Sequence, residues 1–235
     1  MRKIFLLASL TFFINSFGQT SVFNSLLKKH VNSNGFVDYK NLQKEENKLD
    51  SYLSYLNKTT PQKSWSEAKT KAFWVNAYNA YTIKIILDNY PLKSILNIKK
   101  EGKDAWNIPF AKVGGKTYTL NHIEHQILRK KFNDPKIHVA VNCASGSCPL
   151  LGNFAFTESN YEDKTNSLMK KFINDSSKNK ISENNVQLSK IFEWFKGDFT
   201  KKRSLIDFIN TYSNTKVNAK AAVSFLKYDW SLNGK

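Results

Sequence analysis

The spacing of apolar and polar positions along the chain predicts a mainly helical protein. Apolar residues recur at helical intervals in most segments. We expect helices over residues 22–31, 41–57, 66–89, 121–132, 160–175, 190–195, 204–212 and 216–225. The longest opens at Ser64-x-x-Glu67, which is a capping-box pattern, and ends before Pro91. Its middle part, residues 73–81, is apolar nearly all round, which is typical of a helix buried at the centre of a domain.

Short extended runs on either side of turn residues predict a few strands. Gly114-Gly115 indicates a two-residue β-hairpin, and residues 183–185 indicate a second hairpin. Residues 137–141 form a short apolar run, which we expect to be an interior strand. The fold class is therefore α+β: a mainly helical single domain with a central buried helix and a few short strands and hairpins.

The N-terminus has the pattern of a signal peptide. A basic pair at residues 2–3 precedes the apolar residues 4–14, a run that is too short to span a bilayer. We expect cleavage before Gln19, so that residues 1–18 are a signal peptide and residues 19–235 are one globular domain. The protein is then exported, either periplasmic or extracellular. An N-terminal membrane anchor is the alternative, and we expect no transmembrane segment after cleavage.

The chain is strongly basic, with 36 Lys and Arg residues against 19 Asp and Glu residues and a net charge of +17. Such a charge can attract nucleic acid or anionic cell-envelope polymers. The lysines are scattered in pairs instead of forming one stripe, and an exported protein meets little nucleic acid. We therefore expect no nucleic-acid partner and an unknown small-molecule or envelope substrate. No pattern in the sequence indicates an oligomeric state.

Cys143 and Cys148 are the only cysteines, and both lie in a small-residue loop after the expected strand. The N–H groups of such a loop can converge on one spot, where they lower a thiol pKa and hold an oxyanion. In an oxidising compartment, however, an even pair of cysteines often forms a disulfide. A reactive Cys143 and a structural Cys143–Cys148 disulfide both remain open.

Glu124 and His125 are the candidate partners of a reactive thiol. A nucleophilic cysteine needs a base within hydrogen-bond reach, and the base needs an orienting group. His125 would be the base and Glu124 the orienting group. The alternatives are a packed histidine on a helix face and, for Glu124, the acidic residue of a capping box that starts at Asn121. The histidines lack the spacing of a metal site, so we expect no metal and no cofactor.

Asn76, Asn79 and His138 are polar residues in apolar segments. Asn76 and Asn79 are three residues apart on the central helix and share a face. Because an unpaired buried amide costs about 1–3 kcal/mol, each should bind something specific. They either hold a loop backbone or donate to a substrate carbonyl. His138 either lines the site or is a satisfied structural histidine.

Four motifs in a fixed order resemble the domain-of-unknown-function family numbered 547. They are Trp74–Ala80, Ile123–Arg129, Ile137–Pro149 and Phe192–Phe199. The resemblance covers nearly all of the mature chain and implies a shared fold. Plant relatives keep a cysteine matching Cys143, often with serine where Cys148 stands. The resemblance therefore implies a shared polar set of Cys143, His125 and Glu124. Its order, base before cysteine, would fit a permuted papain-like arrangement, which is an analogy.

Two functions are consistent with these features. The first is a thiol-dependent hydrolase or acyl transferase, in which Cys143, His125 and Glu124 act on an amide or thioester. Asn76 or Asn79 would then bind the acyl oxygen. The second is a non-catalytic envelope module that binds or supports other components and is held by a Cys143–Cys148 disulfide. The sequence leaves open whether the protein is an enzyme.

Overall fold

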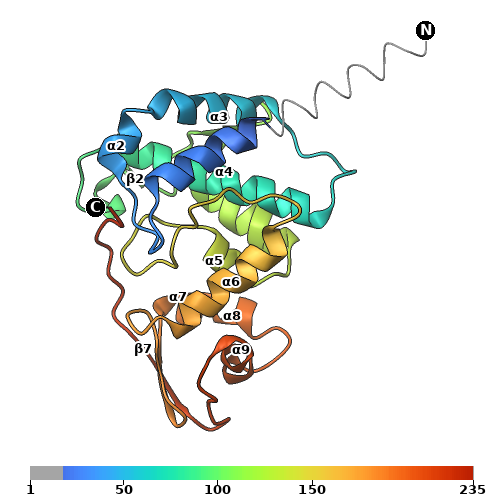
Figure 1. The fold of residues 1–235 in the computed structure, drawn as a ribbon, viewed down its shortest axis with the longest axis vertical. Coiled ribbons are helices and arrows are strands. Elements are labelled where there is room, and N and C mark those ends of the chain that lie inside the picture. Colours follow the sequence, from blue (N-terminus) through green and yellow to red (C-terminus); the bar gives the residue numbers. More distant parts are fainter. Residues whose placement is uncertain (1–17, 235) are drawn as a thin grey trace.

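A computed structural model of the protein describes residues 18–234 (Figure 1). The predicted signal peptide, except for its last residue, lies outside the described residues. The chain forms a mainly helical α+β single domain with several short sheets, as predicted. Across residues 18–234, none of the helices combines the length and the apolar character that crossing a bilayer would need.

Most of the described chain is helical. The helices are one over residues 18–30, α2 (Tyr39–Gln43), α3 (Glu46–Lys58), α4 (Glu67–Leu87), the 3₁₀-helix η1 (Ile95–Asn97), the π-helix η2 (His122–Arg129), α5 (Ile137–Ala140), α6 (Tyr161–Asn174), α7 (Lys190–Trp194), α8 (Lys196–Phe199) and α9 (Leu205–Tyr212). The strands are β1 (Lys99–Lys100), β2 (Lys103–Asp104), β3 (Ala111–Val113), β4 (Lys116–Tyr118), β5 (Lys180–Ile181), β6 (Asn185–Leu188) and β7 (Ala222–Phe225).

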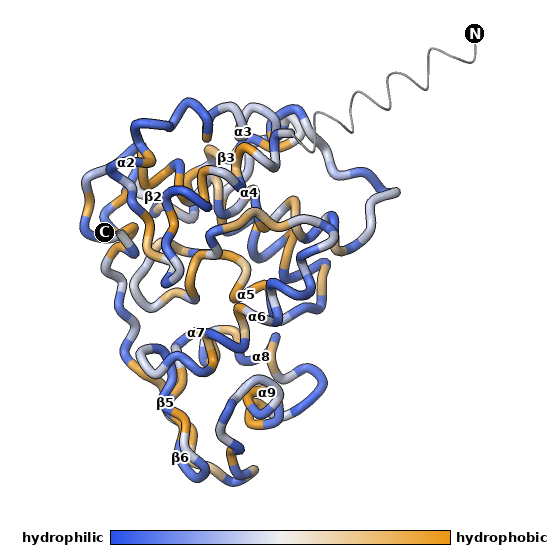
Figure 2. Tube along the Cα trace, in the orientation of Figure 1, coloured by the Kyte–Doolittle hydropathy of each residue, from blue (hydrophilic) through white to orange (hydrophobic). Residues whose placement is uncertain are grey.

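Helix α4 is the centre of the domain, as its apolar sequence predicts. It packs against α3, η2 and α6, and sixteen of its 21 residues are buried. Figure 2 shows apolar residues along this helix and the segments around it. The helix begins differently from the prediction, because the Ser66 side chain accepts a hydrogen bond from the Lys69 N–H. The capping box predicted at Ser64 is therefore wrong, and the cap lies two residues further along the chain.

The two predicted hairpins are confirmed. Strands β3 and β4 are joined by Gly114 and Gly115, which both have positive φ angles, 57° and 74°. Strand β5 pairs with β6 in the second hairpin, and β7 adds to β6 in parallel. We predicted a helix over residues 216–225, and β7 shows that this is wrong. Its Ala- and Val-containing sequence fits a helix locally, but pairing with β6 decides its structure.

The predicted interior strand over residues 137–141 is also wrong, because this segment contains the single helical turn α5. A short apolar run has no periodicity that separates a buried strand from a buried helical turn. Asp134 starts the turn: its side chain accepts a hydrogen bond from Lys136 N–H, and its carbonyl accepts one from Ile137 N–H. After this turn the chain extends from Val141 into the cysteine loop, residues 143–148.

Candidate functional site

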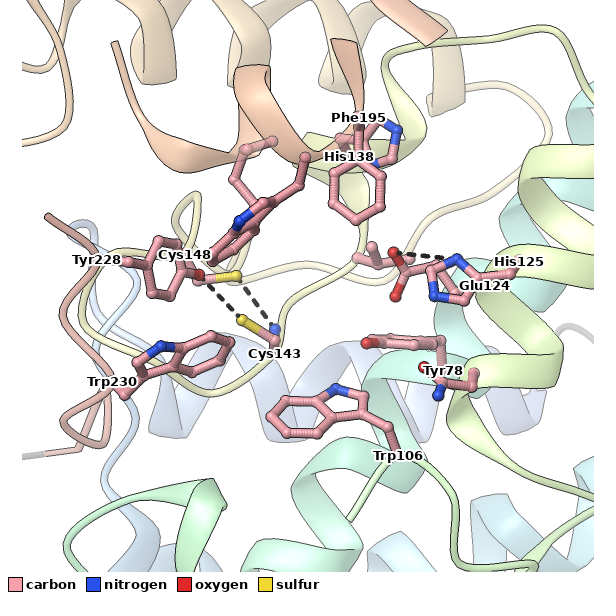
Figure 3. Close-up of a pocket in the computed structure, with 14 residues that line it drawn as sticks. Tyr78, Trp106, Glu124, His125, His138, Cys143, Cys148, Phe195, Tyr228 and Trp230 are labelled. Carbon is pink, nitrogen blue, oxygen red and sulfur yellow. Dashed lines mark hydrogen bonds and ion pairs between the residues drawn. The ribbon is translucent and has the colours of Figure 1, made fainter. Parts of the chain in front are cut away.

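A cavity of about 180 Å³ brings Glu124, His125, His138 and both cysteines to one place (Figure 3). Six segments supply its walls: α4, the segment after β2, η2, the α5–cysteine loop region, the chain around α7, and the C-terminal segment. The lining residues are Tyr78, Trp106, Asn121, Glu124, His125, His138, Val141, Cys143, Cys148, Ile191, Trp194, Phe195, Tyr228 and Trp230. Residues far apart in sequence therefore meet in one pocket.

The cysteine loop is tied down along nearly its whole backbone. Gly146 N–H donates to the Ser231 carbonyl at 2.6 Å, and Ser147 N–H donates to the Asp229 carbonyl at 3.0 Å. Cys148 N–H donates to the carbonyl of Ser145, and Ala144 N–H donates to the Asn142 side chain. The C-terminal segment thus fixes the loop from outside. The expected cluster of unengaged amides is not found, since these N–H groups already have protein acceptors.

Buried asparagines hold the chain immediately before Cys143. Asn79 donates to the Ala140 carbonyl at 2.9 Å and accepts from Asn142 N–H at 2.8 Å. The Asn142 side chain in turn donates to the Pro149 carbonyl, on the far side of the loop. Asn233, near the C-terminus, donates to the Asn142 side chain. Both ends of the cysteine loop are therefore fixed to α4 and to the C-terminal segment.

The Asn76 side chain bonds in a similar way to the backbone of a different loop. Its side chain donates to the Phe156 carbonyl at 2.7 Å and accepts from Phe156 N–H at 2.9 Å. Neither Asn76 nor Asn79 lines the cavity that contains Cys143. Of the two roles that the sequence left open for these residues, their contacts match backbone support. The structure does not bring them to the thiol as direct substrate ligands.

The Cys143 thiol is held by three neighbours. Its Sγ lies 3.1 Å from Ser145 Oγ and 3.3 Å from the Tyr228 hydroxyl, and those two oxygens are 2.9 Å apart. A hydrogen bond from Cys148 is the main effect that lowers the pKa of Cys143; burial raises this pKa, and the Ser145 and Tyr228 bonds lower it further. These contacts favour the thiolate, which is the nucleophilic form.

Cys148 completes this arrangement as a buried thiol. Cys143 N–H donates to Cys148 Sγ at 3.1 Å, and burial raises the pKa of Cys148 well above its usual value. Both cysteines are free thiols, so the structure does not contain the Cys143–Cys148 disulfide. The two thiols are therefore unequal: one is partly accessible and favours ionisation, whereas the other is buried and stays protonated.

The opposite wall is the π-helix η2. Thr119 caps it, because the Thr119 hydroxyl accepts from His122 N–H. The capping box predicted from Asn121 to Glu124 is wrong, since Asn121 makes no side-chain cap. Glu124 is instead 8% exposed and faces the cavity, where the Tyr78 hydroxyl bonds to its carboxyl group. Burial raises the pKa of Glu124, which favours its neutral form.

His125 is engaged by Arg129. The Arg129 guanidinium lies 3.1 Å from His125 Nδ1. Because a guanidinium only donates, Nδ1 must accept, and the neutral ring then carries its proton on Nε2. Glu124 Oε1 is 3.9 Å from the same Nδ1, so no short hydrogen bond allows Glu124 to orient the ring. Burial lowers the pKa of His125. Within residues 18–234, no hydrogen bond joins His125 to Cys143.

His138 belongs to the same charged network. Its Nε2 is 2.8 Å from Asp198, which also accepts a 2.6 Å hydrogen bond from Arg129 Nε. Phe195 stacks on the His138 ring with centroids 4.2 Å apart. The Arg129 guanidinium also lies over the Phe195 ring, 4.6 Å from its centroid. Burial raises the pKa of Asp198, but its bonds to His138 and Arg129 outweigh burial and leave that pKa below its usual value.

Sequence reasoning missed several residues that build the pocket. Tyr228 and Trp230 lie outside the four motifs named above, and nothing local indicated that Tyr228 contacts the thiol. Trp106 contributes a wall from a segment without any motif. Arg129 and Asp198 belong to two of the recognised motifs, but their pairing joins two segments 69 residues apart.

The comparisons with known proteins give a family and no activity. Among the described residues, no three His, Cys, Asp or Glu side chains group in a way that could hold a metal ion. No curated protein and no solved structure matches the chain. The family described as "Protein of unknown function, DUF547" matches residues 62–173. Much of the aromatic wall, including Tyr228 and Trp230, lies outside that range. Residues 62–173 of this chain are therefore a DUF547 domain, and the C-terminal part completes its pocket.

Proposed function

We propose that the protein is an exported, thiol-dependent hydrolase or acyl transferase that acts on an amide or thioester in the cell envelope. One observation carries the proposal: the Cys143 sulfur lies in a pocket and has hydrogen-bond partners that favour its thiolate. Thiolates are the nucleophilic form of cysteine, and a lowered pKa in a partly accessible site is typical of reactive cysteines.

The first half-reaction joins the acyl group to sulfur. The Cys143 thiolate attacks the carbonyl carbon, and a C–S bond forms as the carbonyl becomes an oxyanion. When this intermediate collapses, the bond to the amine or thiol leaving group breaks. Glu124 is suited to give that leaving group a proton, because burial raises its pKa and favours the acid form. The products are a Cys143 thioester and a free amine or thiol.

The second half-reaction reverses these roles. The Glu124 carboxylate takes a proton from water or from an acceptor alcohol or amine, which attacks the thioester carbonyl. The C–S bond breaks, and the Cys143 thiolate and the neutral Glu124 are restored. His125 would act through its Nε2–H group as a donor to the substrate oxygen, because Nδ1 is occupied by Arg129. We therefore assign the proton transfer to Glu124 and substrate binding to His125, where sequence reasoning assigned base and orienting group.

Trapping the acyl-enzyme tests this function. The wild-type protein is mixed with S-phenyl thioacetate and analysed by intact-mass and peptide mass spectrometry. We expect one acetyl group on Cys143, and none in Cys143→Ser under the same conditions. Cys148→Ser serves as the control that keeps the nucleophile. A Cys143 that is neither acetylated nor alkylated in the reduced protein would support the non-catalytic envelope module instead.

A further inference from the structure

The wall of the cavity around Cys143 is made mainly of aromatic side chains. Trp230 packs edge-on against Trp106 and lies nearly parallel to Trp194, at 22° with centroids 5.9 Å apart. The Tyr228 ring lies 4.5 Å from Trp230 and 4.9 Å from Trp194, and its hydroxyl is 3.3 Å from Cys143 Sγ. Three of the chain's five tryptophans line this one cavity. Figure 3 shows Trp106 and Trp230 on the same side of Cys143.

Lysine and arginine are absent from the cavity lining, although the chain has 36 of them. Apart from Cys143, whose contacts favour the thiolate, the residues that could carry charge there favour neutral forms. Burial raises the pKa of Glu124 and lowers the pKa values of His125 and His138. An anionic group would lose its hydration in this cavity and gain no cation in return. The part of a substrate that enters the cavity is therefore neutral.

Several polar side chains of the lining are already paired within the protein. Asn121 donates to Asn107, and His138 bonds to Asp198. Tyr228 bonds to Ser145 and Cys143, and Tyr78 bonds to Glu124. A sugar ring brings several hydroxyl groups that each need a partner, and an unpaired buried hydroxyl is unfavourable. A ring without hydroxyl groups can stack on the indoles without that cost.

The volume of the cavity also indicates the size of the acyl group that it can hold. An apolar cavity of about 150 Å³ can hold a benzene molecule, and this cavity measures about 180 Å³. One six-membered ring beside a carbonyl carbon fits such a volume. Trp194 stands at the mouth, with 46% of its surface exposed, where it could cover one face of an entering ring.

We propose that this cavity binds a neutral aromatic acyl group, with its ring against the indoles of Trp194 and Trp230 and its carbonyl at Cys143. The proposal rests on the proposed function, since it names the acyl group that the thiol would accept. Trp194 is then a residue that determines specificity. It is distinct from the residues assigned to the chemistry, because it touches only the ring.

Binding to Cys143→Ala, which has no nucleophile, isolates recognition from reaction. Titrations by ligand-observed NMR compare N-methylbenzamide with N-methylhexanamide, 4-carboxy-N-methylbenzamide and N-acetylglucosamine. We expect N-methylbenzamide to bind most tightly, and Trp194→Ala in the same background to weaken it by about 3- to 10-fold. The matched control is Phe36→Ala, which removes another exposed aromatic ring, 42% exposed, that is not part of the lining. Its effect on binding should be negligible.

The failures of the two proposals are distinguishable. Equal or tighter binding of the alkyl, anionic or sugar probe would overturn the aromatic site, and so would equal losses in Trp194→Ala and Phe36→Ala. Acetylation of Cys143 in the wild type could still stand in that case. Conversely, ring-selective binding with no acetylation of Cys143 would overturn the thiol chemistry and leave the aromatic site in place.

Discussion

The two walls of the pocket, the cysteine loop and the helix η2, use their hydrogen bonds in opposite ways. On the loop side, Cys148 and Ser145 of the loop and Tyr228 of the C-terminal segment hydrogen-bond to one sulfur. On η2, the polar groups are drawn away from that sulfur: His125 bonds to Arg129, and Arg129 bonds to Asp198. Both walls contain residues that the sequence singled out, but only the wall formed by the cysteine loop contacts the thiol.

Under the proposed function, this difference means that the thiol is activated by its own loop and by the C-terminal segment. A histidine on the facing wall would then not be needed to generate the thiolate. Glu124 and His125 remain available for groups that enter the pocket, which suits proton transfer to a substrate. Thiol reactivity and turnover should therefore respond to different substitutions.

Glu124→Gln should give the largest difference between the effect on turnover and the effect on thiol reactivity. Without the carboxyl proton donor, turnover of an amide substrate should fall by about 10²-fold or more. Alkylation of Cys143 by iodoacetamide should stay within about threefold of the wild-type rate, since the loop contacts are unchanged. The measurement pairs steady-state hydrolysis with site-resolved alkylation. If both rates fall together, the walls do not have separate roles.

Asn79→Ala and Asn76→Ala form a matched pair on one helix. Each loses two buried hydrogen bonds to a loop backbone, so each should lower the free energy of unfolding by about 2–4 kcal/mol. Only Asn79 holds the chain before Cys143. Asn79→Ala should therefore also slow alkylation of Cys143, whereas Asn76→Ala should not. Denaturant unfolding and alkylation kinetics give the two readouts, and equal alkylation rates would contradict the positioning role of Asn79.

Cys148→Ala should weaken the loop's effect on the thiol more modestly. It removes the hydrogen bond that most lowers the pKa of Cys143, so alkylation near neutral pH should slow by about 3- to 10-fold. Cys148→Ser keeps a donor at the same place and should fall between the wild type and Cys148→Ala. Faster alkylation in both variants would show that Cys148 normally blocks Cys143, as a disulfide would.

The network on the η2 side should make stability depend on pH. Burial lowers the pKa of His138, so as pH falls the unfolded chain takes up its proton first, near pH 6.5. The neutral His138 side chain therefore contributes to the free energy of unfolding above about pH 6.5. This contribution is lost as the pH falls from that value toward the lower pKa of His138 in the folded protein. His138→Gln should flatten the decrease in unfolding free energy between pH 7.5 and 5. Urea unfolding at several pH values measures it, and an unchanged slope would contradict the assignment.

The sequence predicts the fold well where local pattern and tertiary packing agree. The all-round apolar character of residues 73–81 correctly placed α4 at the centre, and Gly114-Gly115 correctly located a hairpin. Prediction failed where long-range contacts decide. Pairing with β6, for example, made residues 222–225 a strand. Prediction also failed at residues 137–140, a short apolar run without periodicity that forms a helical turn after the hydrogen bonds to Asp134.

The sequence predicted which residues line the candidate site better than it predicted how those residues contact one another. Cys143, Glu124, His125 and His138 do line one cavity. Their bonding partners could not be predicted, because Tyr228 reaches the thiol across 85 residues of sequence. Likewise, Arg129 occupies His125 Nδ1 from the next turn of an unpredicted π-helix. Such contacts follow from the folded topology and leave no periodic trace in the sequence.

The rate of Cys143 alkylation as a function of pH, measured on wild type, Tyr228→Phe and His125→Ala, tests the central claim most directly. Each curve gives the apparent pKa of the thiol, and peptide mass spectrometry confirms that Cys143 is the site of reaction. Our account predicts that Tyr228→Phe, which loses one hydroxyl, moves the curve to higher pH. His125→Ala should reproduce the wild-type curve. A shift of the curve in His125→Ala with no shift in Tyr228→Phe would contradict the account. It would show that His125, and not Tyr228, lowers the pKa of the thiol.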